Sequence, residues 1–154
     1  MALGFDFDFY GQTYSSVYVG ANGTLNFKAP LSPASNLCLP ASTTDGAILA
    51  WWDDLNPGAG DVWARTSGLS PRRTFEVQWK APHYSGNGLL DVRAVLHEDT
   101  GDIDVCYVDS LGGPGIDHGA SATAGIQGNA TVFIDHGCFA GTLTQGKVVR
   151  YAHP

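Results

Sequence analysis

The sequence predicts an all-β fold, a two-sheet antiparallel β-sandwich of jelly-roll-like type with about ten short strands and almost no helix. Several segments alternate apolar and polar residues with a period of two, as a half-buried strand does. Turn signals separate these segments at a spacing of about 8–12 residues, which is typical of sandwiches and barrels. The chain also has 20 glycines and 8 prolines in 154 residues. No stretch has a convincing 3.6-residue apolar period.

The N-terminal segment, residues 3–9, alternates most clearly, with phenylalanines on one face and Asp6 and Asp8 on the other. This pattern predicts a half-buried strand. Residues 16–19 and 24–28 are then expected to form a hairpin around an Asn-Gly turn. Further strands are expected over residues 47–52, 72–80, 90–97, 103–108, 122–126, 131–134 and 147–151, with Trp63 in another strand-like segment.

Residues 29–45 are rich in Pro, Ser and Thr and have no periodicity, which predicts a long loop across the edge of the sandwich. Cys38 lies in this loop, and Cys138 lies in a second loop-like context, whereas Cys106 is inside a strand pattern. In an oxidising compartment we therefore expect a Cys38–Cys138 disulfide and a free Cys106. Three unpaired thiols are the alternative.

Length and charge restrict the function classes. A chain of 154 residues suits one domain over residues 1–154, which we expect to be part of a larger secreted or surface protein. The net charge of −7 with no basic tract argues against a nucleic-acid partner. No apolar run has the length of a membrane span, so we expect no membrane insertion. The oligomeric state is left open.

The central stretch runs from a short apolar segment, residues 47–52, through Asp53 and Asp54 to a Pro/Gly turn and Trp63. The acids fall where a strand meets its turn, at the rim of a sheet. One interpretation makes this rim a binding edge. The other makes the tryptophans core and the acids turn-capping groups. Because neighbouring residues of a strand face opposite ways, one of Trp51 and Trp52 is expected to face outward.

Ordered motifs along nearly the whole chain resemble a known kind of module, the extracellular β-modules of bacterial secreted and cell-surface proteins related to the nidogen-type (NIDO) domain. The resemblance implies an accessory or adhesive role outside the cell and brings no catalytic residues with it. The chain departs from the pattern at its second Trp and at Cys106. The motifs are Gly4-Phe-x-Phe-x-Phe-Tyr-Gly11, Val17-Tyr-Val-Gly-Ala-Asn-Gly23, Cys38-Leu-Pro40, Trp52-Asp-Asp-Leu55, Val77-Gln-Trp79, Thr100-Gly-Asp-Ile103 and Ala120-Ser-Ala-Thr-Ala-Gly-Ile-Gln127.

We therefore predict a non-catalytic binding or adhesion module whose ligand, a glycan or a protein, binds at a sandwich rim. Flat aromatic side chains are the expected platforms for a carbohydrate. The candidate platforms are Tyr10, Tyr14, Tyr18, Trp52, Trp63 and Tyr84. The predicted ligand-binding residues are Trp52, Asp53, Asp54, Asp61, Trp63, His83 and Tyr84.

Calcium is a possible cofactor at the same rim, with Asp53, Asp54 and Asn56 as its ligands, because hard cations take carboxylate and carbonyl oxygens from irregular loops. Two other function classes stay open. One is a polysaccharide-active enzyme on a jelly-roll sandwich, using converging carboxylates. The other is a structural module that assembles through its edge strands.

Overall fold

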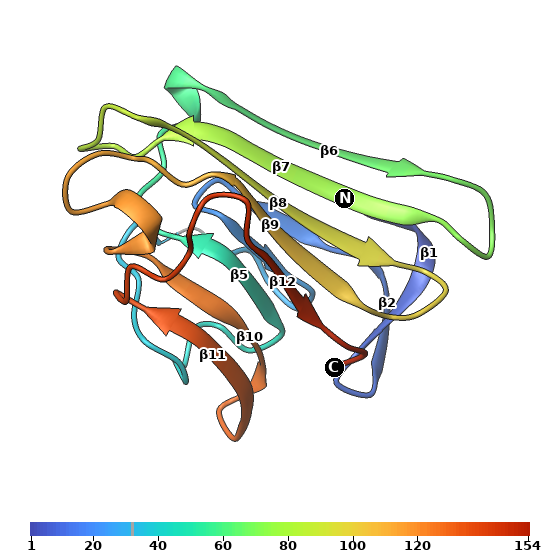
Figure 1. Ribbon diagram of the computed structural model, residues 1–154. Helices are drawn as coiled ribbons and strands as arrows, with labels where there is room; N and C mark the ends of the chain where they lie inside the picture. Colours follow the sequence, from blue (N-terminus) through green and yellow to red (C-terminus); the bar gives the residue numbers. More distant parts are fainter. Residues whose placement is uncertain (32) are drawn as a thin grey trace.

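The computed structural model describes residues 1–31 and 33–154 and confirms the all-β prediction (Figure 1). In this part of the chain twelve strands form antiparallel sheets of two, five and five strands, and 4% of the residues are helical. The strands are β1 (Ala2–Phe9), β2 (Gln12–Ser16), β3 (Tyr18–Gly20), β4 (Thr24–Asn26), β5 (Ala47–Trp52), β6 (Asp61–Ser67), β7 (Thr74–Pro82), β8 (Leu89–His97), β9 (Ile103–Asp109), β10 (Thr123–Asn129), β11 (Val132–Cys138) and β12 (Val148–Tyr151). Two short 3-10 helices are η1 (Pro57–Ala59) and η2 (Asp117–Gly119).

The two five-stranded sheets lie as two layers (Figure 1). The β5 sheet has the order β11-β10-β5-β4-β3, and the β8 sheet has the order β12-β9-β8-β7-β6. The chain crosses from one sheet to the other in the segments β5–β6, β9–β10 and β11–β12. Strand registers place these crossovers and the β7–β8 loop at one end of the sandwich, which we call the rim. The hairpin turns β6–β7, β8–β9 and β10–β11 lie at the other end.

The alternation seen in the sequence matches the packing of the sandwich interior. The phenylalanines of β1 are at most 6% exposed, and the rings of Phe7 and Phe9 pack against Phe27. In β7 and β8 the inward positions predicted from alternation are buried, including Val77, Trp79 and Ala94. Burial of these side chains supplies most of the driving force for the fold.

β5 differs from the other strands because all of its residues, Ala-Ile-Leu-Ala-Trp-Trp, are buried. One face, with Trp51, points into the sandwich, and the other, with Trp52, packs into a second apolar cluster. Leu31 and Leu39 of the 27–46 loop belong to that cluster. The expectation that Trp51 or Trp52 faces solvent is therefore wrong, because the loop covers the outer face of the β5 sheet.

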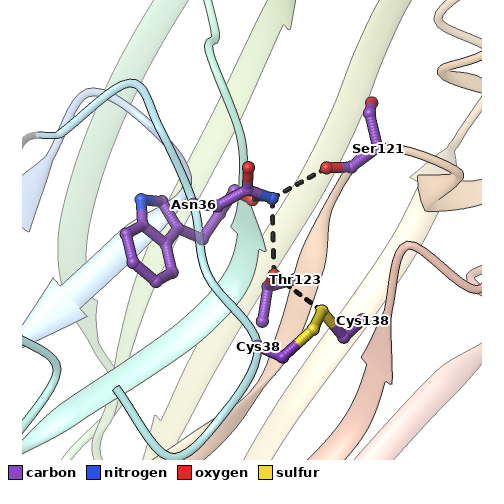
Figure 2. Close-up of a disulfide and its surroundings, with 6 residues drawn as sticks. Asn36, Cys38, Ser121, Thr123 and Cys138 are labelled. Atoms are coloured by element: carbon purple, nitrogen blue, oxygen red, sulfur yellow. Dashed lines mark hydrogen bonds between the residues drawn. A yellow bond between two sulfur atoms is a disulfide. The ribbon is translucent and has the colours of Figure 1, made fainter. Parts of the chain in front are cut away.

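A disulfide joins Cys38 to Cys138 across 100 residues, with a Cα–Cα distance of 5.3 Å, and Cys106 is free. This is the expected pairing, although the expected loop setting holds only for Cys38, because Cys138 is the last residue of β11. Asn36 adds to the same attachment, since its Nδ2 donates to Ser121 O at 2.7 Å (Figure 2). The same Nδ2 also donates to Trp52 O at 2.8 Å. The 27–46 loop is thus fixed to both β5 and β11.

Candidate functional site

The rim is organised around the carboxylate of Asp53, the first residue after β5. Asp53 is 4% exposed. Its Oδ2 accepts a hydrogen bond from Ser121 Oγ at 2.6 Å, and its Oδ1 lies 3.1 Å from His83 Nε2. The backbone N–H of Asp54 also donates to Oδ1, at 2.9 Å. A buried carboxylate needs such donors, because burying an unpaired charge is expensive.

His83 connects Asp53 to the β7–β8 loop. Its Nδ1 accepts the backbone N–H of Ser85 at 3.1 Å, and an amide N–H can act only as a donor. The ring proton of the neutral imidazole is therefore on Nε2, from which it is donated to Asp53. Ser85 Oγ also lies 3.0 Å from Nδ1, so the imidazole of His83 links the side chain of Ser85 to that of Asp53. Because Nδ1 already accepts the Ser85 amide, we interpret this arrangement as a fixed turn rather than an activated nucleophile.

Backbone hydrogen bonds join the segment after β5 to the segment after β7. Tyr84 N donates to Asp54 O at 2.8 Å, and Asn56 N donates to Pro82 O at 2.8 Å. Leu55 and His83 form an isolated antiparallel bridge. The two segments therefore behave as a short ladder, which gives the rim a rigid base.

A small pocket of about 160 Å³ opens beside this base. We call it the rim pocket, and its lining residues are Ser85, Gly86, Asn87, Gly113 and Pro114. The β7–β8 loop and the segment between β9 and β10 approach closely at this pocket, since a Cβ at position 86 would collide with the carbonyl oxygen of Gly112. Glycine is required there because it has no side chain.

Tyr84 directly precedes Ser85 of the pocket lining, and 73% of its surface is accessible. Its backbone is fixed by the bond to Asp54, while its ring is free to contact a ligand. Trp63 lies on the outer face of the β8 sheet, paired with Gln78, and the Arg65 guanidinium lies 5.1 Å from its ring centroid. Trp63 therefore belongs to the sheet face and not to the pocket.

The structure brings some of the predicted site residues together and separates others. Asp53 and His83 are in contact, and Asp54 and Tyr84 meet through their backbones. Asp61 is exposed at the start of β6, opposite Lys80 in register. Trp52 does not offer a binding platform, because it is 1% exposed and its Nε1 donates to Pro33 O at 3.0 Å.

Sequence reasoning did not identify Ser121 or Asn22 as part of the rim. Ser121 lies two residues before Thr123, which is opposite Trp52 in the register of β10 and β5. Asn22 Oδ1 accepts the N–H of Leu55 at 3.1 Å. Both residues lie within motifs of the family resemblance, but those motifs assign them no site role, and both contacts depend on strand pairing.

In residues 1–31 and 33–154, no three His, Cys, Asp or Glu side chains converge in a way that could hold a metal ion. Both carboxylate oxygens of Asp53 already accept hydrogen bonds. A calcium ion at the predicted place would therefore have to use Asp54, Asn56 and backbone carbonyls, the oxygen ligands that this cation accepts.

A family model described as NIDO related matches residues 1–144. No curated protein and no solved structure matches the chain. Among the described residues there is no helix with the length and apolar character needed to cross a membrane.

Proposed function

The chain belongs to the NIDO-related family, an extracellular type of domain, and on this premise we propose that it is a secreted or cell-surface binding module that recognises a carbohydrate at the rim. The observation that carries the proposal is Tyr84, an aromatic ring that is 73% exposed on a loop whose base is rigid. A flat, exposed ring offers a sugar a large contact area at low conformational-entropy cost. The rim pocket, whose lining begins at the next residue, Ser85, offers hydroxyl, amide and backbone groups for the sugar hydroxyls.

An extracellular setting is supported by the disulfide, since such bonds persist mainly in oxidising compartments. We propose binding without catalysis, because the Ser85–His83–Asp53 arrangement is held as a turn. Incubation with a panel of glycans should release no product. Hydrolysis that Asp53→Asn abolishes in a folded protein would instead favour the polysaccharide-active alternative.

The proposal is tested with Tyr84→Ala on a glycan array and by titration of the best-bound glycan. We expect loss of about 1–3 kcal/mol of binding free energy, as for removal of one stacking aromatic residue. Tyr18→Ala is the matched control, because Tyr18 is also exposed, at 48%, but lies on β3. Equal effects of the two substitutions, or no glycan binding by the parent protein, would contradict a carbohydrate site at Tyr84.

A second candidate function is assembly through an edge strand. β11 pairs with β10 and ends the β5 sheet, and it exposes 43% of Val132, 37% of Phe133 and 46% of Ile134. Exposed apolar edge strands are templates for pairing with another chain. If this edge assembles, light scattering should show a mass that rises with concentration and returns to that of a monomer in Ile134→Lys. A constant monomer mass would exclude this function.

A further inference from the structure

A second pocket lies at the end of β5 opposite to the rim. It has a volume of about 220 Å³ and is formed between the β1–β2 turn, the start of β5 and the β10–β11 turn. We call it the hairpin pocket, and the residues used below are Tyr10, Gln12, Tyr14, Lys28, Gly128 and Asn129. Its volume is below the roughly 300–1,000 Å³ of sites for drug-sized ligands, so it suits a single ring.

Tyr10 occupies a turn position that disfavours its residue type. Phe9 and Gln12 are paired, so Tyr10 and Gly11 form a two-residue hairpin loop, with φ values of 49° and 74°. Such turns usually have Asn-Gly or Asp-Gly, because a positive φ is unfavourable for other side chains. Strained residues of this kind cluster at ligand sites. The Tyr10 hydroxyl is also buried, with no hydrogen-bond partner among the described residues.

Lys28 places a fixed positive charge at the pocket. Its aliphatic chain lies over Gly46, where a Cβ would come within 2.8 Å of Lys28 Cγ, and its Nζ donates to Gly128 O at 3.2 Å. In the described part of the chain no carboxylate forms an ion pair with Lys28. Two of the three ammonium donors are thus available to an anion.

The remaining walls supply a ring surface and neutral hydrogen-bonding groups. Tyr14 stacks one face on Phe27, with ring centroids 4.9 Å apart, which fixes its orientation. Asn129 Oδ1 accepts from Thr131 N and Oγ1 and from Val132 N, so the amide is held with Nδ2 free to donate. Gln12 uses its Nε2 on Gly11 O, and its Oε1 is free to accept.

From this combination we propose that the hairpin pocket binds a sugar that carries a carboxylate, a hexuronic acid unit, independently of the rim. The carboxylate receives charge-assisted hydrogen bonds from Lys28 Nζ. The apolar face of the sugar ring lies against the tyrosines, and its hydroxyls exchange hydrogen bonds with Asn129 and Gln12. A neutral sugar of the same shape leaves the lysine without an anion.

The test is a titration of the protein with methyl β-D-glucuronide and, in parallel, with its neutral amide, followed by the backbone amide signals in NMR spectra. We expect the signals of Gly46, Gly128 and Asn129 to shift with the glucuronide. The amide should bind about tenfold more weakly, the effect of losing one charge-assisted hydrogen bond. No shifts at these residues, or equal affinities for the two sugars, would overturn the proposal.

Substitutions in the hairpin pocket test whether the glucuronide binds there. Lys28→Met and Tyr14→Ala should each weaken glucuronide binding about tenfold or more. Lys147→Met is the matched control, since Lys147 Nζ likewise donates to a backbone carbonyl, Thr142 O at 3.0 Å, but does not line this pocket. This control should bind the glucuronide as the parent does. If Lys28→Met and Lys147→Met weaken binding equally, only the overall charge matters and the pocket has no role.

Discussion

At the scale of single residues, Asp53 and Asp54 are neighbours in the chain and have different surroundings. Asp53 is buried and accepts hydrogen bonds from three elements of the rim, whereas Asp54 is half-buried and interacts with Tyr84 through its own carbonyl oxygen. The turn-stabilising interpretation therefore applies to the Asp53 side chain. The Asp54 carboxylate is the one that is accessible to a ligand or a cation.

We predict that Asp53→Ala lowers the free energy of unfolding by about 1–3 kcal/mol or more, because His83 and Ser121 lose a buried charged acceptor. Asp54→Ala should change it by no more than about 0.5 kcal/mol, as for most partly exposed positions. Urea denaturation of both variants measures this difference. Equal losses would mean that the two carboxylates share one structural role.

The Asp54→Ala variant also tests whether calcium binds at the rim. If Asp54 and Asn56 hold the ion, added calcium should raise the melting temperature of the parent protein over that in a chelator, and Asp54→Ala should remove the increase. A melting temperature that is independent of calcium would exclude a site of useful affinity at this rim.

Glu98 is a second residue with a defined electrostatic role. Arg73 donates to it from Nε at 2.8 Å and from Nη2 at 2.5 Å, and Arg73 N donates at 2.9 Å. These hydrogen bonds from Arg73 lower the pKa of Glu98 from 4.5 to about 2. Because the pKa is lower in the folded protein, the pair stabilises the fold above pH 4.5 and loses this effect as the pH falls toward about 2.

We therefore predict that the melting temperature falls further between pH 4.5 and about 2 in the parent protein than in Glu98→Gln. The variant is less stable at neutral pH, and the two proteins converge as Glu98 becomes protonated. Thermal denaturation of both proteins at several pH values across this range measures the difference in their melting temperatures. A constant difference in melting temperature across the whole range would show that the ion pair does not titrate with folding.

At the scale of elements, β5 and the 27–46 loop depend on each other. β5 has no polar face, so its outward side chains need a cover, and the loop supplies Leu31 and Leu39 against Trp52 and Leu49. Within the loop, residues 27–31 and 33–46 form no helix or strand. The loop is fixed at Cys38 and Asn36, which explains how an irregular segment remains over an apolar sheet face.

The disulfide should accordingly contribute strongly to stability. For a loop of 100 residues, the chain-entropy model gives about 4–5 kcal/mol, which the double variant Cys38→Ser, Cys138→Ser should lose. Denaturation of this variant beside Cys106→Ser, which leaves the bond intact, measures the loss. Mass mapping of non-reduced peptides should recover the Cys38–Cys138 link, and a link to Cys106 would contradict the assignment.

At the scale of the whole molecule, the two ends of the sandwich are more available for recognition than its faces. The outer face of the β5 sheet is covered by the 27–46 loop, and the outer face of the β8 sheet carries ion pairs such as Arg65–Glu76 and Arg150–Asp104. The rim collects the crossovers between sheets and the β7–β8 loop, and the opposite end collects the β6–β7, β8–β9 and β10–β11 turns. Each end has one of the two pockets described above.

Local patterns in the sequence were sufficient for the fold class, for most strands and for the inward residues of β1, β7 and β8. Alternation is a property of neighbouring residues, and the pleat of a strand converts it directly into an inner and an outer face. The Cys38–Cys138 pairing was also expected from local context, because the sequence around both cysteines is loop-like while Cys106 stands in a strand pattern, although in the structure Cys138 is the last residue of β11.

Tertiary structure alone decided the burial of Trp52 and the composition of both pockets. The covering of a sheet face depends on how a distant loop returns to it, and alternation within the strand carries no information about that return. Likewise, Asp53 meets His83 and Ser121, which are 30 and 68 residues away in the chain. These contacts are set by strand register and by the closing of two sheets on one another, so a pattern read along the chain cannot supply them.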